Sequence, residues 1–151
     1  MLRPSKKMLF AIEAVLDIAY HAGGEPVQSR EITRRQGIPR RYLEQTLQQL
    51  VRSGILTGVR GPRGGYRLAR ERRRVTVGEI VRVVRALEAA EEQAEEVPTS
   101  ELGKEVIRPM WTGLQDEIMA RLDEITIDDL CMRSYQSGIV SEVAQKMDFT
   151  I

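Results

Sequence analysis

The sequence has very little cysteine, histidine and aromatic side chain. Its 151 residues include one cysteine, Cys131, and one histidine, His21, and 5% of the chain is aromatic. A single cysteine allows no intrachain disulfide and fits a reducing, cytoplasmic compartment. With one histidine the chain offers no Ser/His/Asp or Cys/His set for nucleophilic catalysis, so we expect no enzyme. We expect no metal site either, because a lone histidine at a helix end more often caps or packs.

Long hydrophobic runs are also absent. No apolar stretch approaches the ~20 residues that a membrane span needs. The N-terminus, with basic residues ahead of apolar ones, looks like a signal peptide, but Glu13 and Asp17 interrupt the apolar stretch. It is better interpreted as an amphipathic helix. We expect a globular chain with no membrane partner.

The small net charge of +1 hides a strong asymmetry between the two halves. Residues 1–85 hold 18 Lys and Arg against 7 Asp and Glu, a net charge of +11. Residues 86–151 hold 5 against 15, a net charge of −10. A basic half joined to an acidic half predicts a polyanion-binding domain followed by a segment with a different task.

Helical spacing of apolar residues recurs through the basic half. We expect a first helix capped by Ser5, a short helix over 29–36 capped by Ser29, and a third helix that opens at Pro39. Two short alternating stretches around residues 55–59 and 66–68 follow, which predicts a β-hairpin. Two short helices, a tight turn and a hairpin make a winged helix-turn-helix, so the fold class is mainly α with a small β-hairpin wing.

The acidic half has a different pattern. Thr76 caps a helix over 77–88, and an acidic stretch with Pro98 follows as a linker. An apolar stripe marks a long helix from Thr99 or Ser100 to Ile125, which Pro109 kinks or starts, and Thr126 caps a short last helix. We divide the chain into a winged helix-turn-helix domain (1–85), an acidic loop (86–100), the long and short helices (101–133) and a C-terminal tail (134–151).

The third predicted helix carries polar side chains suited to base edges in the DNA major groove. Arg40 and Arg41 suit guanine, Gln45 suits adenine, and Glu44 can accept from the cytosine amino group. Basic residues on the first two helices are candidates for phosphate contacts. These are Lys6, Lys7, Arg34 and Arg35.

The stretch RGPRGGYRL (60–68) combines charge with a tight turn between the two strands. A hairpin tip beside a recognition helix lies over the minor groove, which admits slim cationic side chains. Arg60 and Arg63 supply the charge, and Gly61, Gly64 and Gly65 supply positive φ and close backbone approach. The arginine run at 70–74 is either a phosphate contact or a solvated surface.

Several longer stretches then carry a resemblance to a known family. The chain contains SKKMLFAIEAVLDIA, GIPRRYLEQTLQQLVRSGIL, VRGPRGGYRLAR, VTVGEI, MWTGLQDEI and EITIDDL. From about Leu2 to Arg133 it resembles the Rrf family of bacterial winged-helix transcription regulators. The resemblance implies a homodimeric transcription repressor that binds double-stranded DNA. In such a protein Arg60 would enter the minor groove. The residues that would read the major groove, or position the protein on it, are Arg41, Tyr42, Glu44 and Gln45. It also implies that the long helix crosses the same helix of the second subunit and buries four apolar residues in the dimer interface: Trp111, Leu114, Ile118 and Leu122.

The chain departs from this family where many members hold an iron–sulfur cluster. Cluster-binding members carry three cysteines in the loop before the long helix, but LEAAEEQAEEVPTSELGKE has none. A further histidine ligand of some members falls on Arg108. Since such clusters prefer soft thiolates, we expect no cluster and no other cofactor. The resemblance is to a cluster-free branch, which works with a partner enzyme or a small-molecule effector.

Two alternatives stay open from the sequence. The acidic half could be an interaction module that docks on a metabolic enzyme such as a cysteine-synthesis enzyme. Cys131 could be a redox sensor, although Asp128 and Asp129 beside it favour a buried, unreactive thiol with a raised pKa.

Overall fold

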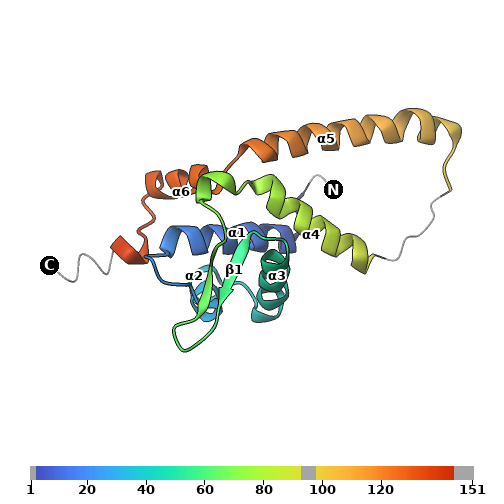
Figure 1. Cartoon of the computed structure of the whole chain (residues 1–151). Helices are drawn as coiled ribbons and strands as arrows, with labels where there is room; N and C mark the ends of the chain where they lie inside the picture. The colour runs from blue at the N-terminus through green and yellow to red at the C-terminus, as the bar shows by residue number, and fades with distance from the viewer. Residues whose placement is uncertain (1–2, 93–97, 145–151) are drawn as a thin grey trace.

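The computed structural model describes residues 3–92 and 98–144 (Figure 1). In chain order the elements are α1 (Lys6–His21), α2 (Ser29–Gln36), α3 (Arg40–Arg52), β1 (Leu56–Val59), β2 (Gly65–Leu68), η1 (Arg72–Arg74), α4 (Val77–Glu91), η2 (Gly103–Ile107), α5 (Arg108–Glu124) and α6 (Ile127–Gln136). This order confirms the mainly helical fold with a hairpin wing. None of the helices within the described ranges is both long and apolar enough to cross a membrane.

Side-chain caps set most of the helix starts. The hydroxyls of Ser5, Thr76 and Thr126 accept backbone N–H groups of the first turns of α1, α4 and α6, as the sequence predicts. The prediction for α2 is wrong by one residue. Gln28 is its N-cap, and the backbone N–H of Gln28 donates to the Glu31 carboxylate at 2.9 Å. That arrangement leaves Ser29 inside the first turn.

The core lies where α1 meets α3, α4 and α6. Its largest buried side chains come from almost every element of the basic half: Ile18, Ile32, Ile38, Leu43, Leu47, Leu50, Ile55, Leu56 and Ile80. Ile127 and Cys131 of α6 join the same cluster. Backbone bonds from Ile127 to Val75 and from Val77 to Ile125, both 2.8 Å, fix α6 beside the start of α4. α6 therefore packs with the helix-turn-helix, although more than forty residues of chain separate the start of α4 from α6.

The wing is tied to the body at its base. β1 and β2 pair antiparallel, with Leu56 opposite Leu68 and Val59 opposite Gly65. Tyr66 adds two backbone hydrogen bonds to Val27, each 2.8 Å, so the loop between α1 and α2 acts as a short third strand. The angle of the hairpin is thereby fixed relative to the helices.

α5 lies along one side of the molecule, and one end extends well beyond the body (Figure 1). The backbone widens into a π-helical stretch, η2, before Pro109, which lies in the first turn of α5. Proline has no N–H to donate, so this local widening accommodates it. At the other end Arg82 of α4 makes two 2.6 Å bonds to Asp123, which clamp the helices together and lower the pKa of the Asp123 carboxyl. α4 itself runs one turn past its predicted end, to Glu91.

Candidate nucleic-acid interface

The helix α3 has one apolar and one polar face. Leu43, Leu47 and Leu50 are buried, whereas Arg40, Arg41, Glu44 and Gln45 are exposed near its N-terminus. Its apolar residues recur at three- and four-residue steps, so packing against α1 turns the polar face outward. The structure therefore places these four side chains at the surface, as the sequence predicts.

Both arginines of this polar face interact with neighbouring side chains on α3. Arg40 Nε lies 2.9 Å from Glu44 Oε1, one turn along the helix. The Arg41 guanidinium lies 5.0 Å from the centre of the Tyr42 ring and donates to its hydroxyl at 3.2 Å. Such exposed pairs are worth little in water, so each side chain can exchange its partner for a phosphate or a base.

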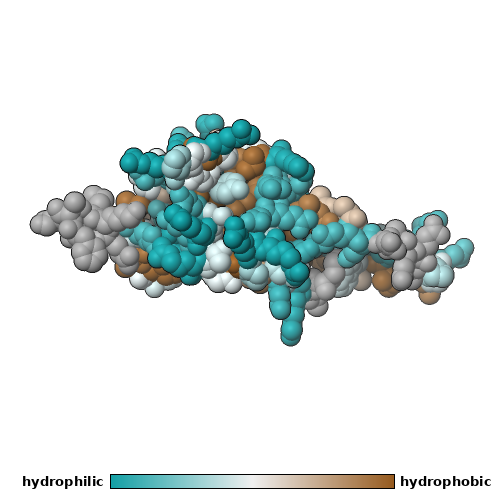
Figure 2. Space-filling model, turned by 90° about the horizontal axis from the view of Figure 1, so that it is seen from below, coloured by the Kyte–Doolittle hydropathy of each residue, from teal (hydrophilic) through white to brown (hydrophobic). Residues whose placement is uncertain are grey.

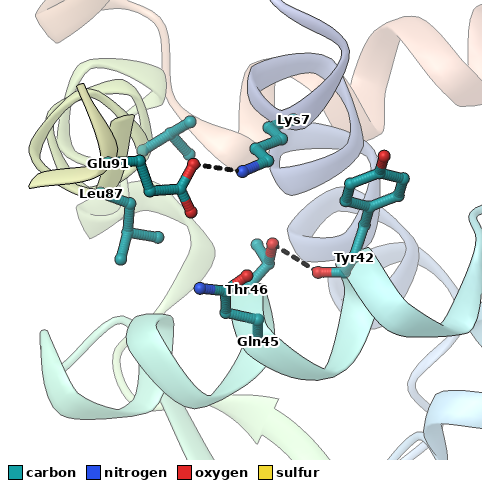
Figure 3. Close-up of a pocket in the computed structure, with 7 residues that line it drawn as sticks. Lys7, Tyr42, Gln45, Thr46, Leu87 and Glu91 are labelled. Carbon is teal, nitrogen blue, oxygen red and sulfur yellow. Dashed lines mark hydrogen bonds and ion pairs between the residues drawn. The ribbon is translucent and has the colours of Figure 1, made fainter. Parts of the chain in front are cut away.

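Tyr42 and Gln45 face a hollow beside α4 (Figure 3). Tyr42 is half-buried, with its ring centre 6.3 Å from that of Phe10. Lys7, Gln45 and Glu91 line the hollow with it, and Lys7 Nζ pairs with Glu91 at 2.6 Å. Gln45 is exposed and also borders this hollow, so it lies where the polar face of α3 meets the end of α4.

The backbone conformation of the wing requires glycine at several positions. Gly61 has φ 109°, a region that other residues rarely adopt. A Cβ on Gly64 would lie 2.2 Å from the Val59 carbonyl oxygen, and one on Gly65 would lie 2.5 Å from the Val27 oxygen. The turn is therefore narrow. Arg60 and Arg63 stand exposed on it, with no ion pair to any described residue.

An open groove separates the wing from α2. Arg30, Thr33 and Arg40 line its helical side. The wing lines the other side with Gly61, Pro62, Gly64, Gly65 and Tyr66. The underside of the molecule, which carries α2, α3 and the hairpin, is hydrophilic over much of its middle (Figure 2). Sequence reasoning missed Arg30. Its signal was a basic residue on the outer face of the first helix of the motif, one turn before Arg34.

Other predicted phosphate ligands have internal partners. Arg35 donates to both oxygens of the buried Asp17, at 2.8 and 2.9 Å, and this hydrogen bonding raises the pKa of Arg35. In the arginine run, Arg70 pairs with Glu79 at 3.0 Å and Arg72 with Asp128 at 2.7 Å. These arginines tie helices together, which favours the structural interpretation of the run.

The single cysteine and the single histidine both pack within the fold. Cys131 is buried, and burial above all raises the pKa of its thiol, with the Asp128 charge adding to the effect and Arg72 opposing it. A thiol with a raised pKa holds little thiolate, which disfavours the redox hypothesis. His21 ends α1 and accepts a backbone N–H through Nδ1, so it packs as predicted.

A winged helix-turn-helix with a basic recognition surface is shared by several families, and comparison with known proteins decides among them. The Rrf2 family profile, described as an iron-dependent transcriptional regulator, matches residues 4–133. The chain belongs to the Rrf2 family. Rrf2 proteins are transcription regulators, so this chain is a DNA-binding transcription regulator with a winged-helix fold.

Named relatives agree with this assignment. The transcriptional regulator IscR of Pectobacterium atrosepticum is 34% identical over 131 residues, which cover 85% of this chain and 79% of that protein. The solved structure of T. potens IscR superposes with a TM-score of 0.72 at 32% identity, over 92% of this chain and 93% of that one. CymR of B. subtilis, described as the global cysteine regulator, gives 0.68 at 29% identity, over 88% and 98%.

Proposed function

We propose that this Rrf2 protein is a homodimeric, cluster-free repressor that places α3 in the major groove and its wing in the adjacent minor groove. The observation that carries the proposal is the groove between α2 and the wing. Arg40 from α3 and the wing glycines line the same groove, so helix and hairpin can straddle one backbone strand. A dimer bound across a promoter then represses transcription because it covers the promoter DNA.

The contacts differ in kind between helix and wing. On α3 we assign Arg40, Arg41, Glu44 and Gln45 to base edges or flanking phosphates, with Tyr42 as a positioning residue because it is half-buried against Phe10. On the wing, Arg60 and Arg63 enter the minor groove, while Gly61, Gly64 and Gly65 keep the tip narrow.

The dimer proposal rests on the exposed apolar face of α5. Trp111, Leu114 and Ile118 are 40%, 47% and 57% exposed, and Leu122 continues the row. Val106, Ile107 and Met110 extend it toward the end of the helix that projects from the body, each at least half exposed. A contiguous apolar patch of this kind marks an interface. A second copy of the same helix, crossing it about a two-fold axis, covers both faces at once.

The residues present do not fit an iron–sulfur cluster. A cluster of this type needs several thiolates, but the chain has one cysteine, buried in α6. Across residues 3–92 and 98–144, no three His, Cys, Asp or Glu side chains come together as a metal site. Regulation therefore calls for another signal, and a small-molecule effector or a partner enzyme stays a prediction.

The DNA contacts are tested by selection from sheared genomic DNA. We expect wild-type protein to retain an inverted repeat, and Arg60→Ala to lose most of that enrichment, above all at sites with A·T-rich flanks. Arg85→Ala removes an equal charge from the exposed surface of α4 and should leave binding nearly unchanged. If Arg60→Ala bound the selected repeat as tightly as wild type, the wing assignment would be wrong.

The dimer interface is tested separately by molar mass. Ile118→Glu places a charge in the middle of the proposed seam and should convert the dimer to a folded monomer in light scattering. Glu117→Gln, one residue away, should leave the mass at that of the dimer. A dimer that survives Ile118→Glu would place the interface elsewhere.

A further inference from the structure

The chain after α6 folds back onto the helix-turn-helix. The Tyr20 hydroxyl donates to the Ile139 carbonyl, and the Glu142 N–H donates to His21 Nδ1 at 3.1 Å. Val143 packs over Gly23, where a Cβ would lie 2.6 Å from its Cγ2. In Figure 1 this segment lies beside the end of α1, where the chain turns toward α2. Residues 139–144, which we call the C-terminal clamp, thus dock on the end of α1 and on the turn that leads to α2.

The clamp brings one negative charge to two arginines of α2. Glu142 Oε1 lies 2.8 Å from Arg34 Nη2, and Oε2 lies 3.0 Å from Arg35 Nη1. Burial pushes the pKa of the Glu142 carboxyl up, but its bonds to the two arginines outweigh this and hold the pKa below its usual value. Arg35 already has Asp17 as a buried partner. The charge that Glu142 chiefly neutralises is therefore that of Arg34, whose side chain is 64% exposed.

Arg34 lies on α2 one helical turn after Arg30, just outside the lining of the groove between α2 and the wing. It is four residues after Arg30, and residues at that spacing are neighbours on one helix face. Arg30 and Thr33 line the groove opposite the wing. Without Glu142, the row Arg30–Arg34 would extend the positive surface of the groove by one turn.

We propose that the C-terminal clamp is an autoinhibitory contact, in which Glu142 competes with the DNA backbone for Arg34. The inference rests on the proposed DNA-binding function and goes beyond it by placing a regulatory element in the chain itself. Release of the clamp adds one phosphate contact per subunit and strengthens binding to any duplex, because phosphate contacts carry no sequence information.

His21 makes the clamp responsive to pH. Its Nδ1 accepts the Glu142 N–H, and a protonated imidazole has no lone pair for that bond. The charged groups around it are Asp17 on α1, Arg34 and Arg35 on α2, and Glu142 itself, and the Tyr20 ring packs at 5.3 Å. Burial is the main reason why the pKa of docked His21 lies below 6.5. Protonation therefore favours the released state, and the clamp loosens as the pH falls below about 6.5.

The test compares full-length Glu142→Gln with wild type on a random-sequence duplex and on the selected repeat. We expect about two- to fivefold tighter binding of both, in line with one surface ion pair. We also expect the slope of log K against log salt to steepen by about 0.9 per added contact. Glu13→Gln makes the same charge change on the exposed side of α1 and should alter neither quantity.

Two further variants separate charge from docking. Gly23→Ala displaces Val143 without any change of charge, and should tighten binding as Glu142→Gln does. In an Arg34→Gln background, the Glu142→Gln substitution should no longer change the affinity. Lowering the pH from 7.5 to 5.5 should bring wild type close to Glu142→Gln, but should have no such effect in His21→Gln.

The outcomes are distinguishable. Wild-type protein that binds no duplex at low salt would contradict the proposed function. Wild type that binds duplex, with Glu142→Gln and Gly23→Ala indistinguishable from it, would overturn the clamp alone. An affinity gain in Glu142→Gln that persists in the Arg34→Gln background would mean that Glu142 acts through general charge repulsion, which also overturns it.

Discussion

The buried contact between Asp17 and Arg35 gives the sharpest prediction for stability. The Asp17 side chain is fully buried and that of Arg35 is 10% exposed, and the two are joined by a two-point ion pair. Gln36 adds a third bond to Asp17 at 2.8 Å. Replacing one partner of such a pair strands the other charge in the interior and costs about 3–5 kcal/mol. Because Glu142 still contacts Arg35, we expect Asp17→Ala to lower the free energy of unfolding by about 3 kcal/mol, the low end of that range.

Urea denaturation followed by circular dichroism, at fixed protein concentration, measures this loss. Asp17→Leu combined with Arg35→Met removes both charges and should recover most of it, since no charge is then left buried without a partner. Glu13→Gln, on the exposed side of the same helix, should stay within about 0.5 kcal/mol of wild type. A loss below about 1 kcal/mol for Asp17→Ala, or a double variant no more stable than the single one, would contradict this account of the buried pair.

Three further predictions concern the core, the wing and acid stability. Leu50→Ala removes a fully buried side chain and should cost about 2–5 kcal/mol in the same denaturation assay. Gly65→Ala adds a Cβ 2.5 Å from the Val27 oxygen at φ 155°, so it should displace the wing and weaken binding to the selected repeat, while light scattering gives an unchanged molar mass. The pKa values of Asp123 and Asp129 are lowered from 3.8, by hydrogen bonds from Arg82 and from the Thr126 backbone N–H respectively. Their stabilising contribution is present above that pH and lost below it, so the melting temperature should fall as the pH drops below about 4, and less steeply in Asp129→Ala.

The prediction of α3 and the wing from sequence worked because both depend on local chemistry. The spacing of Leu43, Leu47 and Leu50 fixes which face of α3 turns inward. The glycines at 61, 64 and 65 permit only a narrow turn, which leaves Arg60 and Arg63 at its surface. The cap at α2 was misassigned by one residue because Gln28 and Ser29 both offer a side-chain acceptor, and the reach of the Glu31 carboxylate decided between them.

Contacts between segments that are distant in the chain had no comparable local pattern in the sequence. In the sequence Asp17 stands out only as an interruption of an apolar stretch, although a charge inside a buried helix face requires a partner. That partner, Arg35, comes from the next helix, so its assignment to DNA phosphates followed from its type alone. The sequence leaves Arg72 open between a phosphate contact and a solvated surface, and in the structure it pairs with an aspartate more than fifty residues further along the chain.

Residue type and spacing within a few turns of chain were enough to predict the helices, the narrow basic wing and the lack of thiolates for a cluster, and the quoted stretches carried the resemblance to the family. They were not enough to say which arginines remain available to DNA, because that depends on the acid that folding places opposite each one. The packing of α6 into the core of the helix-turn-helix is likewise a result of folding. So is the position of Glu142, which comes more than one hundred residues after Arg34 and lies within ion-pair distance of it.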